Sequence, residues 1–146
     1  MRENAELAKA ALYNGRYGSL AVLDAEGGGP YAALVNYACD ANALPTFLFS
    51  GLARHTRCLL KDPRASLLVA DIPSEGDALS GLRVSFSGIM ARIEASEIKA
   101  AYIAKHPYAA GYVEFGDFGF WKLQPDFVHL VAGFGRIETL KSEDVF

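Results

Sequence analysis

The hydrophobic positions of this chain change their period after residue 15. Before that point, apolar residues recur at helical spacing and predict an amphipathic helix over Glu3–Asn14, with Gly15 as its left-handed stop. After it, apolar and polar residues alternate over short runs, which is typical of strands with one buried face. The buried stripe predicted for the helix comprises Leu7, Ala8, Ala11 and Leu12.

Two alternating runs, Tyr17–Leu23 and Pro30–Tyr37, flank the flexible segment Asp24–Gly29 and predict an antiparallel hairpin. A longer run over Leu82–Ile93 predicts an extended strand, with Arg83 on its polar face. The other predicted elements are a turn at Asp40–Leu44, a strand at Ala65–Ala70, a loop at Asp71–Gly81, a helix at Glu97–Lys105 capped by Ser96, an aromatic segment at Tyr108–Gly116, and strands at Phe118–Leu123 and Phe127–Val131 around a turn or bulge at Gln124–Asp126.

These elements together predict an α+β fold that is mainly β. About six or seven strands with three inserted helices, without regular alternation of strand and helix, favour an antiparallel barrel with flanking helices. A chain of 146 residues fits one domain, so residues 1–146 are expected to form a single unit. The sequence contains no internal repeat.

The segment after the hydrophobic run Phe47–Phe49 carries the clearest chemical signal. The run ends at Ser50 and Gly51, where a helix is predicted to open with its leucine-bearing face buried and basic side chains in its first turns. Free backbone amides, the helix dipole and basic groups together suit a phosphate dianion. Short basic helices are also common as solvated surface elements, and that alternative stays open. The phosphate-compatible residues are Arg54, His55, Thr56 and Arg57; the predicted buried face comprises Leu52, Thr56, Leu59 and Leu60.

The composition argues against a nucleic-acid-binding protein. Hydrophobic residues make up 51% and charged residues 21% of the chain, as in globular proteins. The net charge is −3 and the pI is near 5.6, so the single local basic cluster indicates a small anionic ligand rather than nucleic acid. Cys39 and Cys58 are expected to be buried small hydrophobes in a reducing compartment. No run of about 18 apolar residues occurs, so no membrane partner and a cytoplasmic location are expected.

The histidines His106 and His129 have no neighbouring ligand at a spacing that a helix or strand would bring together. An axial haem ligand or a metal site with Cys39 is therefore not expected, and neither is any other metal site. His106 precedes Pro107 at a predicted helix end, where capping of free carbonyls is the simpler role. No nucleophile elbow is present for Ser-His-Asp hydrolysis.

A series of short phrases spans nearly the whole chain in a specific order and spacing. They are Tyr31–Asn36, Leu48–Ser50, Arg54–Arg57, Asp62–Arg64, Arg83–Gly88, His106–Pro107, Phe115–Phe118 and Gly133–Gly135. In these phrases the chain resembles the flavin mononucleotide (FMN) binding split β-barrels of the pyridoxamine phosphate oxidase superfamily, and more closely their haem-utilisation branch.

The resemblance implies a homodimer with FMN sites at the subunit interface. Arg54 and His55 match the family's phosphate-binding basic pair, with His55 where the oxidases have lysine, and Thr56 and Arg57 supplement them. Ser50 matches the residue beside the ribityl chain. Two further positions are implied near the flavin ring: Asn36, where the oxidases have lysine, and Arg83, where they have glutamine.

Trp121 does not fall at the position of the oxidases' cofactor-contacting tryptophan and is expected to be core or interface. The cross-subunit flap is instead expected at Gly133, Phe134 and Arg136. No arginine–leucine–histidine sequence follows, so pyridoxamine phosphate is not an expected substrate. The resemblance implies an FMN-dependent oxidoreductase; the alternative is a non-catalytic module that binds FMN or haem. No side chain stands out as a general acid or base.

Overall fold

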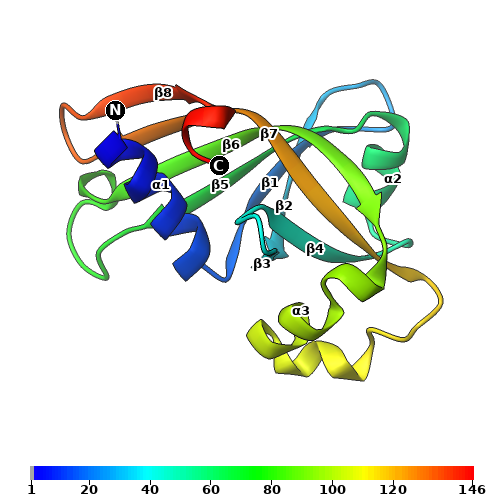
Figure 1. Cartoon of the computed structure of the whole chain (residues 1–146). Helices are drawn as coiled ribbons and strands as arrows, with labels where there is room; N and C mark the ends of the chain where they lie inside the picture. Colours follow the sequence, from blue (N-terminus) through cyan, green and yellow to red (C-terminus); the bar gives the residue numbers. More distant parts are fainter. Residues whose placement is uncertain (1) are drawn as a thin grey trace.

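The computed structural model describes residues 2–146, which form one curled antiparallel sheet with helices at its ends (Figure 1). The α+β split-barrel prediction is confirmed. The helices are α1 (Arg2–Asn14), α2 (Arg54–Lys61) and α3 (Lys99–Lys105). The strands are β1 (Tyr17–Leu23), β2 (Pro30–Asn36), β3 (Ala38–Cys39), β4 (Pro45–Ser50), β5 (Arg64–Asp71), β6 (Leu82–Ile93), β7 (Phe118–Ala132) and β8 (Ile137–Lys141).

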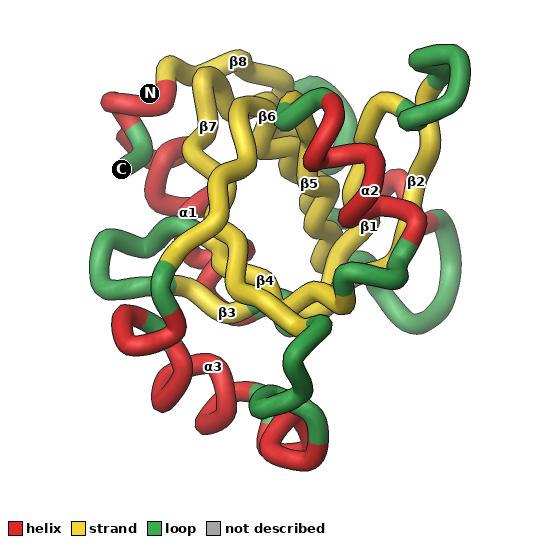
Figure 2. The backbone as a smooth tube through the Cα atoms, turned by 90° about the vertical axis from the view of Figure 1, so that its right-hand side faces the viewer, coloured by secondary structure: helices red, strands yellow, loops and turns green. Residues whose placement is uncertain are grey.

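The sheet runs in the order β2-β1-β5-β6-β7-β4-β3, with β8 also paired to β7. All pairings are antiparallel, and the predicted hairpin is present with Leu20 opposite Ala33. Figure 2 shows the strands curling around a common centre. Within residues 2–146 the path ends at β2 on one side and at β4 with the two-residue β3 on the other, so the barrel is open between β2 and β4.

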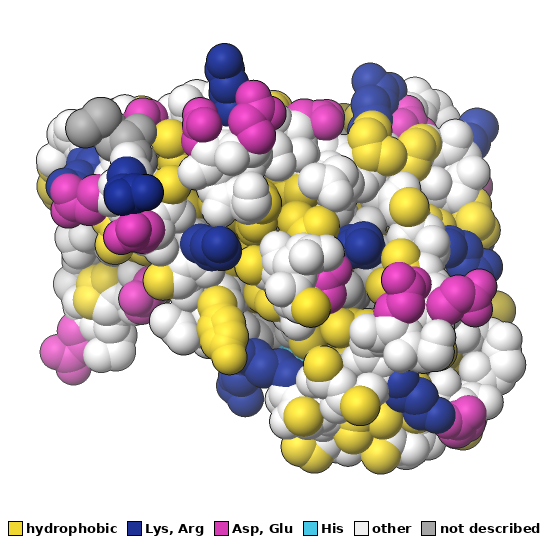
Figure 3. Space-filling view, in the orientation of Figure 1, with side chains coloured by type: hydrophobic (Ala, Val, Ile, Leu, Met, Phe, Trp, Pro, Cys, Tyr) yellow, Lys and Arg dark blue, Asp and Glu magenta, His cyan; other side chains and the backbone are white. Residues whose placement is uncertain are grey.

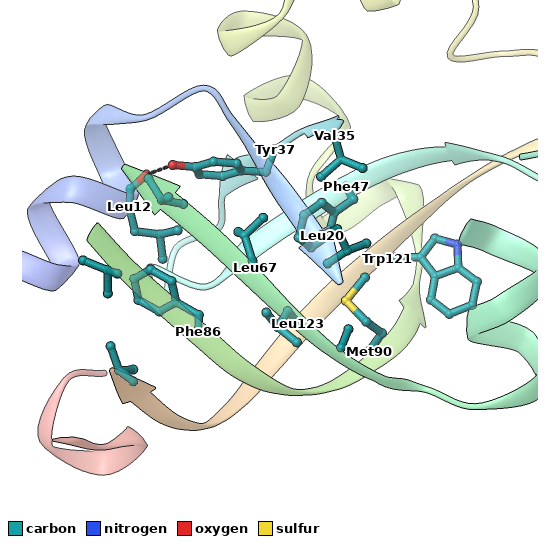
Figure 4. Packing of buried hydrophobic residues seen from close by; sticks show 14 of the residues in the cluster. Leu12, Leu20, Val35, Tyr37, Phe47, Leu67, Phe86, Met90, Trp121 and Leu123 are labelled. Carbon is teal, nitrogen blue, oxygen red and sulfur yellow. Dashed lines mark hydrogen bonds between the residues drawn. The ribbon is translucent and has the colours of Figure 1, made fainter. Parts of the chain in front are cut away.

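The inward side chains of the curled sheet form the main core (Figure 4). α1 closes one end of it with Ala8 and Leu12, both fully buried, and the hydroxyl of Tyr37 donates to the carbonyl oxygen of Leu12 at 2.6 Å. Gly15 ends α1, but not in the predicted left-handed conformation. Glycine is required there because a Cβ would lie 2.2 Å from the Tyr37 hydroxyl.

The second helix begins later than the sequence predicts, and its buried face is different. The chain turns between Ser50 and Ala53, where the Ser50 hydroxyl accepts from the Leu52 amide at 3.1 Å, and α2 starts at Arg54. This turn directs Leu52 outward, and Leu60 also faces solvent, at 80% and 64% exposure respectively. The residues of α2 that face the core are Thr56, Cys58 and Leu59.

Of the turn or bulge predicted at Gln124–Asp126, the structure has the bulge, and β7 is one continuous strand instead of two. The register against β6 shifts after Ser87, which pairs with Phe127, while Gly88 pairs with Pro125. The extra residue forms a bulge that keeps Pro125 within the strand. β8 was not predicted; it follows the turn at residues 133–136 and pairs along β7.

Residues 94–117 form a helical arm beside the open side of the barrel, visible below the sheet in Figure 1. Ser96 is not its helix cap; Glu94 and Glu97 form a capping box around a short 3-10 turn, and α3 follows. Tyr102 of α3 is 2% exposed and packs edge-on against Phe120 of β7. The arm therefore has a small core of its own that fixes it to β4 and β7.

Candidate functional site

A slot lies where the barrel is open, between the edges of β2 and β4. Its volume is about 200 Å³. Three elements contribute its walls: the end of β2, the end of β4 with the turn into α2, and the helical arm. The lining residues are Leu34, Val35 and Asn36 from β2, Leu48, Phe49 and Ser50 from β4, Ala53 and His55 from the start of α2, and Tyr102 and Tyr112 from the arm.

Seven of the ten residues that line the slot are apolar or aromatic, while polar and apolar atoms share its surface about equally; the polar side chains on the strand ends and α2 are Asn36, Ser50 and His55. Ser50 is already engaged, because its hydroxyl donates to Oδ2 of Asp117 at 2.9 Å while it accepts from a backbone amide. A carboxylate at this position opposes a phosphate dianion, since like charges repel at short range. The arrangement suits a flat, largely apolar ligand with a few polar anchors.

His55 is the imidazole of the slot. Its ring meets Phe49 edge-on, with centroids 4.3 Å apart, and its Nε2 is buried without a hydrogen-bond partner. Burial lowers the pKa of His55 below its usual value of 6.5, so the ring is neutral at pH 7. A neutral imidazole with an unpaired nitrogen is the form that binds metal ions, and it is a weaker partner for phosphate than an imidazolium.

The predicted basic cluster does not converge in the structure. Arg54 turns away from the slot, donates to Oδ2 of Asp24 at 2.6 Å and lies over the ring of Tyr31. This hydrogen bond lowers the pKa of the Asp24 carboxyl. Thr56 faces the core at 4% exposure with its hydroxyl unpaired, and Arg57 is exposed. Of the predicted site residues, the slot therefore brings together Asn36, Ser50 and His55.

The other predicted site residues lie at a different place, around the turn between β7 and β8. Arg83 donates to the carbonyl of Leu79 at 2.9 Å, and its Nε is buried without a partner. Gly133 and Phe134 belong to the turn; Gly133 has a positive φ of 65°, and Phe134 is 78% exposed. Arg136 pairs with Glu3 of α1 at 3.2 Å. None of these residues lines the slot of its own chain.

Tyr102 and Tyr112 are slot residues that the sequence interpretation missed. The sequence predicts the aromatic segment that contains Tyr112, but the place of this segment against β4 depends on how the arm packs. Trp121 is confirmed as a core residue at 4% exposure (Figure 4). The Arg92 guanidinium lies over its ring. His106 does not cap a helix carbonyl with its side chain; its Nε2 bonds instead to the carbonyl of Tyr37.

Exposed apolar side chains lie on the outer surface of the sheet beside the slot. Leu34 of β2 and Leu68 of β5 both lie opposite Ser19 of β1, so the three side chains share the outer face. Leu34 is 73% exposed and Leu68 is 43% exposed, with Tyr17 nearby at 57%. On the face shown in Figure 3, acidic and basic side chains are interspersed, while hydrophobic side chains gather over the helical arm.

Comparison with known proteins gives the family. The model of the CREG β-barrel family matches residues 1–146. The chain belongs to this family. A curated relative, the chloroplastic non-canonical heme oxygenase HOZ of Arabidopsis thaliana, is 38% identical over 109 residues. That match covers 73% of this chain and 33% of the relative, so the chain spans about a third of the curated relative's length.

Solved structures agree with this placement. A heme-binding protein from Mycobacterium smegmatis superposes with a TM-score of 0.89 at 32% identity, covering 97% of this chain and 59% of that one. HutZ, the heme storage protein of Vibrio cholerae, shares the fold at 24% identity with a TM-score of 0.69, over 91% of this chain and 96% of that one. Within residues 2–146, no helix is long and apolar enough to span a membrane.

Proposed function

We propose that this CREG-family chain is a haem-binding protein of the haem oxygenase-like kind, and that the slot between β2 and β4 is its haem site. Two relatives support the proposal by name: the heme oxygenase HOZ and the heme-binding protein of M. smegmatis, which are 38% and 32% identical to this chain. When bound, haem iron supplies oxygen and electron-transfer chemistry. The chain supplies binding, orientation and exclusion of water.

The observation that carries this proposal is the state of His55. It is a neutral imidazole that lines the slot, and its Nε2 is buried without a hydrogen-bond partner. Those properties fit a ligand to haem iron. They fit the phosphate of FMN less well, because the nearby guanidinium of Arg54 is held by Asp24 and Ser50 is bonded to the carboxylate of Asp117.

The size of the slot favours a second chain as its missing wall. Ligand pockets usually measure about 300–1,000 Å³, whereas the slot of one chain measures about 200 Å³. Leu34 belongs both to the slot and to the exposed apolar face that continues through Leu68. A homodimer that buries this face would cover the slot and remove the apolar surface from water together. In this proposed dimer, Arg83 and residues 133–136 of one chain would contact the ligand in the slot of the other chain.

Haem titration tests the site directly. Purified protein with one equivalent of haem should develop a sharpened Soret band at about 400 nm. His55→Ala should weaken haem binding by about tenfold or more, since loss of an iron ligand costs more than about 1.4 kcal/mol of binding free energy. Added imidazole should restore the wild-type spectrum. His129→Ala is the matched control, because His129 lies on β7 and bonds to Thr139. Equal spectra and affinities for wild type and His55→Ala would refute the role of His55.

FMN binding, with flavin-dependent oxidoreductase activity, is the second candidate. The observation that favours it is the first turn of α2, which begins at Arg54, four residues after Ser50, and whose first amides have no partners within the helix. Parallel titrations of the apo-protein with FMN and with haem distinguish the two proposed functions. Saturable quenching of flavin fluorescence, with no change in the haem spectrum, would replace the first proposal by the second.

A further inference from the structure

His106 is a fully buried imidazole with two defined hydrogen bonds. It lies between the end of α3 and Pro107, with Nε2 2.7 Å from the carbonyl oxygen of Tyr37 and Nδ1 2.9 Å from the hydroxyl of Tyr108. A carbonyl oxygen only accepts, so Nε2 carries the proton. In the neutral ring Nδ1 is then unprotonated and accepts the phenolic proton of Tyr108. The fold thus holds a base against one particular tyrosine.

The same imidazole contacts one ring that lines the slot and one that is exposed to solvent. Tyr102 lines the slot at 2% exposure, and its ring centroid is 5.0 Å from that of His106. Tyr108 is 57% exposed, and its centroid is 5.8 Å from that of His106. Burial raises the pKa of Tyr102, which therefore stays a neutral phenol. The three rings form a continuous aromatic path from the slot wall to solvent.

We propose that Tyr102, His106 and Tyr108 form a redox relay that carries one oxidising equivalent from the slot to the surface, a role that rests on the proposed haem function. Bound haem together with hydrogen peroxide would supply the one-electron oxidant. Tyr108 gives up one electron by way of Tyr102. At the same time the O–H bond of Tyr108 breaks and the proton moves to Nδ1 of His106, so the products are a neutral tyrosyl radical, an imidazolium and the oxidant reduced by one electron.

The geometry makes Tyr108 the preferred site of oxidation. Loss of an electron from a phenol makes its proton strongly acidic, so a base already in contact lowers the cost of the step. In the resulting imidazolium, the Nε2–H group still donates to the carbonyl oxygen of Tyr37, and this oxygen stabilises the new positive charge. The groups that face His106 are Tyr37, Tyr102 and Tyr108, with Lys105 adjacent in sequence. Tyr13 is similarly exposed, at 63%, but has no such base among its described contacts.

The tyrosine–histidine pair is tested in the apo-protein, independently of haem. A photogenerated ruthenium tris-bipyridine oxidant should produce a tyrosyl radical, measured by electron paramagnetic resonance, among the seven tyrosines of the chain. Tyr108→Phe should lower the radical yield severalfold, whereas the matched control Tyr13→Phe should leave it unchanged. Equal yields in wild type and Tyr108→Phe would overturn the proposal.

The role of His106 as proton acceptor has its own measurement. Oxidation of Tyr108 in the wild type should be slower in D2O than in H2O, because the proton moves with the electron. His106→Gln should slow the same step severalfold. If that variant fails to fold, the isotope effect in the wild type still decides: equal rates in the two solvents would exclude proton transfer to Nδ1.

The connection to the slot is tested in haem-loaded protein treated with hydrogen peroxide. The tyrosyl signal should appear at Tyr108 and should drop severalfold in Tyr102→Phe, which keeps the ring but removes the oxidisable phenol. The same variant should leave the ruthenium experiment unchanged. An undiminished peroxide signal in Tyr102→Phe would refute the path. Failure of the wild type to bind haem would refute the proposed function and this connection, while the apo measurement would still decide the pair.

Discussion

The bond between Tyr37 and α1 gives a sharp stability prediction. The Tyr37 hydroxyl lies 2.6 Å from the carbonyl oxygen of Leu12, and both residues are 0% exposed (Figure 4). Leu12 is in the last turn of α1, where carbonyls have no partner within the helix. The other group near this oxygen is the Cys39 thiol, a weak donor at 3.8 Å. Tyr37→Phe should therefore destabilise the fold by about 1–3 kcal/mol, the cost of a buried unpaired acceptor.

Urea denaturation measures this loss as a lower midpoint at an unchanged m-value. Tyr13→Phe removes an exposed hydroxyl and should stay within about 0.5 kcal/mol of wild type. A loss below about 0.5 kcal/mol for Tyr37→Phe would refute the reasoning.

Gly15 allows a second test of the same bond. A Cβ at Gly15 would lie 2.2 Å from the Tyr37 hydroxyl, so Gly15→Ala must displace it. In the Tyr37→Phe background that clash is absent, and Gly15→Ala should cost at least about 1 kcal/mol less than it does in the wild type. Additive losses in this double-mutant cycle would contradict the geometry.

Three further outcomes are expected. Burial lowers the pKa of His55, so the unfolded chain binds a proton at this residue more tightly than the folded chain does. The stability that His55 contributes is complete above pH 6.5 and is lost as the pH falls toward the folded pKa. Haem affinity measured from pH 8 to 5 should therefore fall in acid, whereas an FMN affinity that depends on an imidazolium should rise. Gly88→Ala would place a Cβ 2.0 Å from a backbone oxygen of β7 and should cost about 2–4 kcal/mol in urea denaturation, while Gly111→Ala, with open space around it, should cost much less. Leu68→Glu should abolish the proposed dimer in sedimentation and weaken haem binding with it, whereas Leu60→Glu on α2 should change neither; a dimeric Leu68→Glu would argue against this interface.

Alternation was a reliable guide where one face of a strand is buried. β1, β2 and β6 lie within a residue of their predicted bounds because their inward side chains must fill the core. The division into two strands at Gln124–Asp126 was wrong, but the bulge predicted there as the alternative to a turn is present opposite Gly88 and accommodates Pro125, which lacks an amide hydrogen. The local sequence does not decide between turn and bulge, because the outcome depends on pairing with the neighbouring strand.

The candidate site likewise contains residues that the sequence predicts and residues whose position depends on tertiary packing. Asn36 and Ser50 end strands on the two sides of the opening, and His55 follows in the next helix, so all three reach the slot from elements that were predicted. Arg54 does not reach it, because its ion pair with Asp24 joins residues far apart in sequence. Tyr102 reaches the slot through the packing of the arm against Phe120, which no sequence pattern encodes.

The order of the strands also bears on how the chain folds. β1 with β2, β5 with β6, and β7 with β8 are neighbours in sequence and can pair as soon as each hairpin forms. β4 pairs instead with β7, bringing Phe47 opposite Trp121 across the intervening strands and the helical arm. Contacts between distant residues form late because the loop they close is entropically costly. We therefore expect the slot to be among the last parts of the molecule to be assembled, so that a ligand bound there stabilises the fully folded chain over partly folded forms.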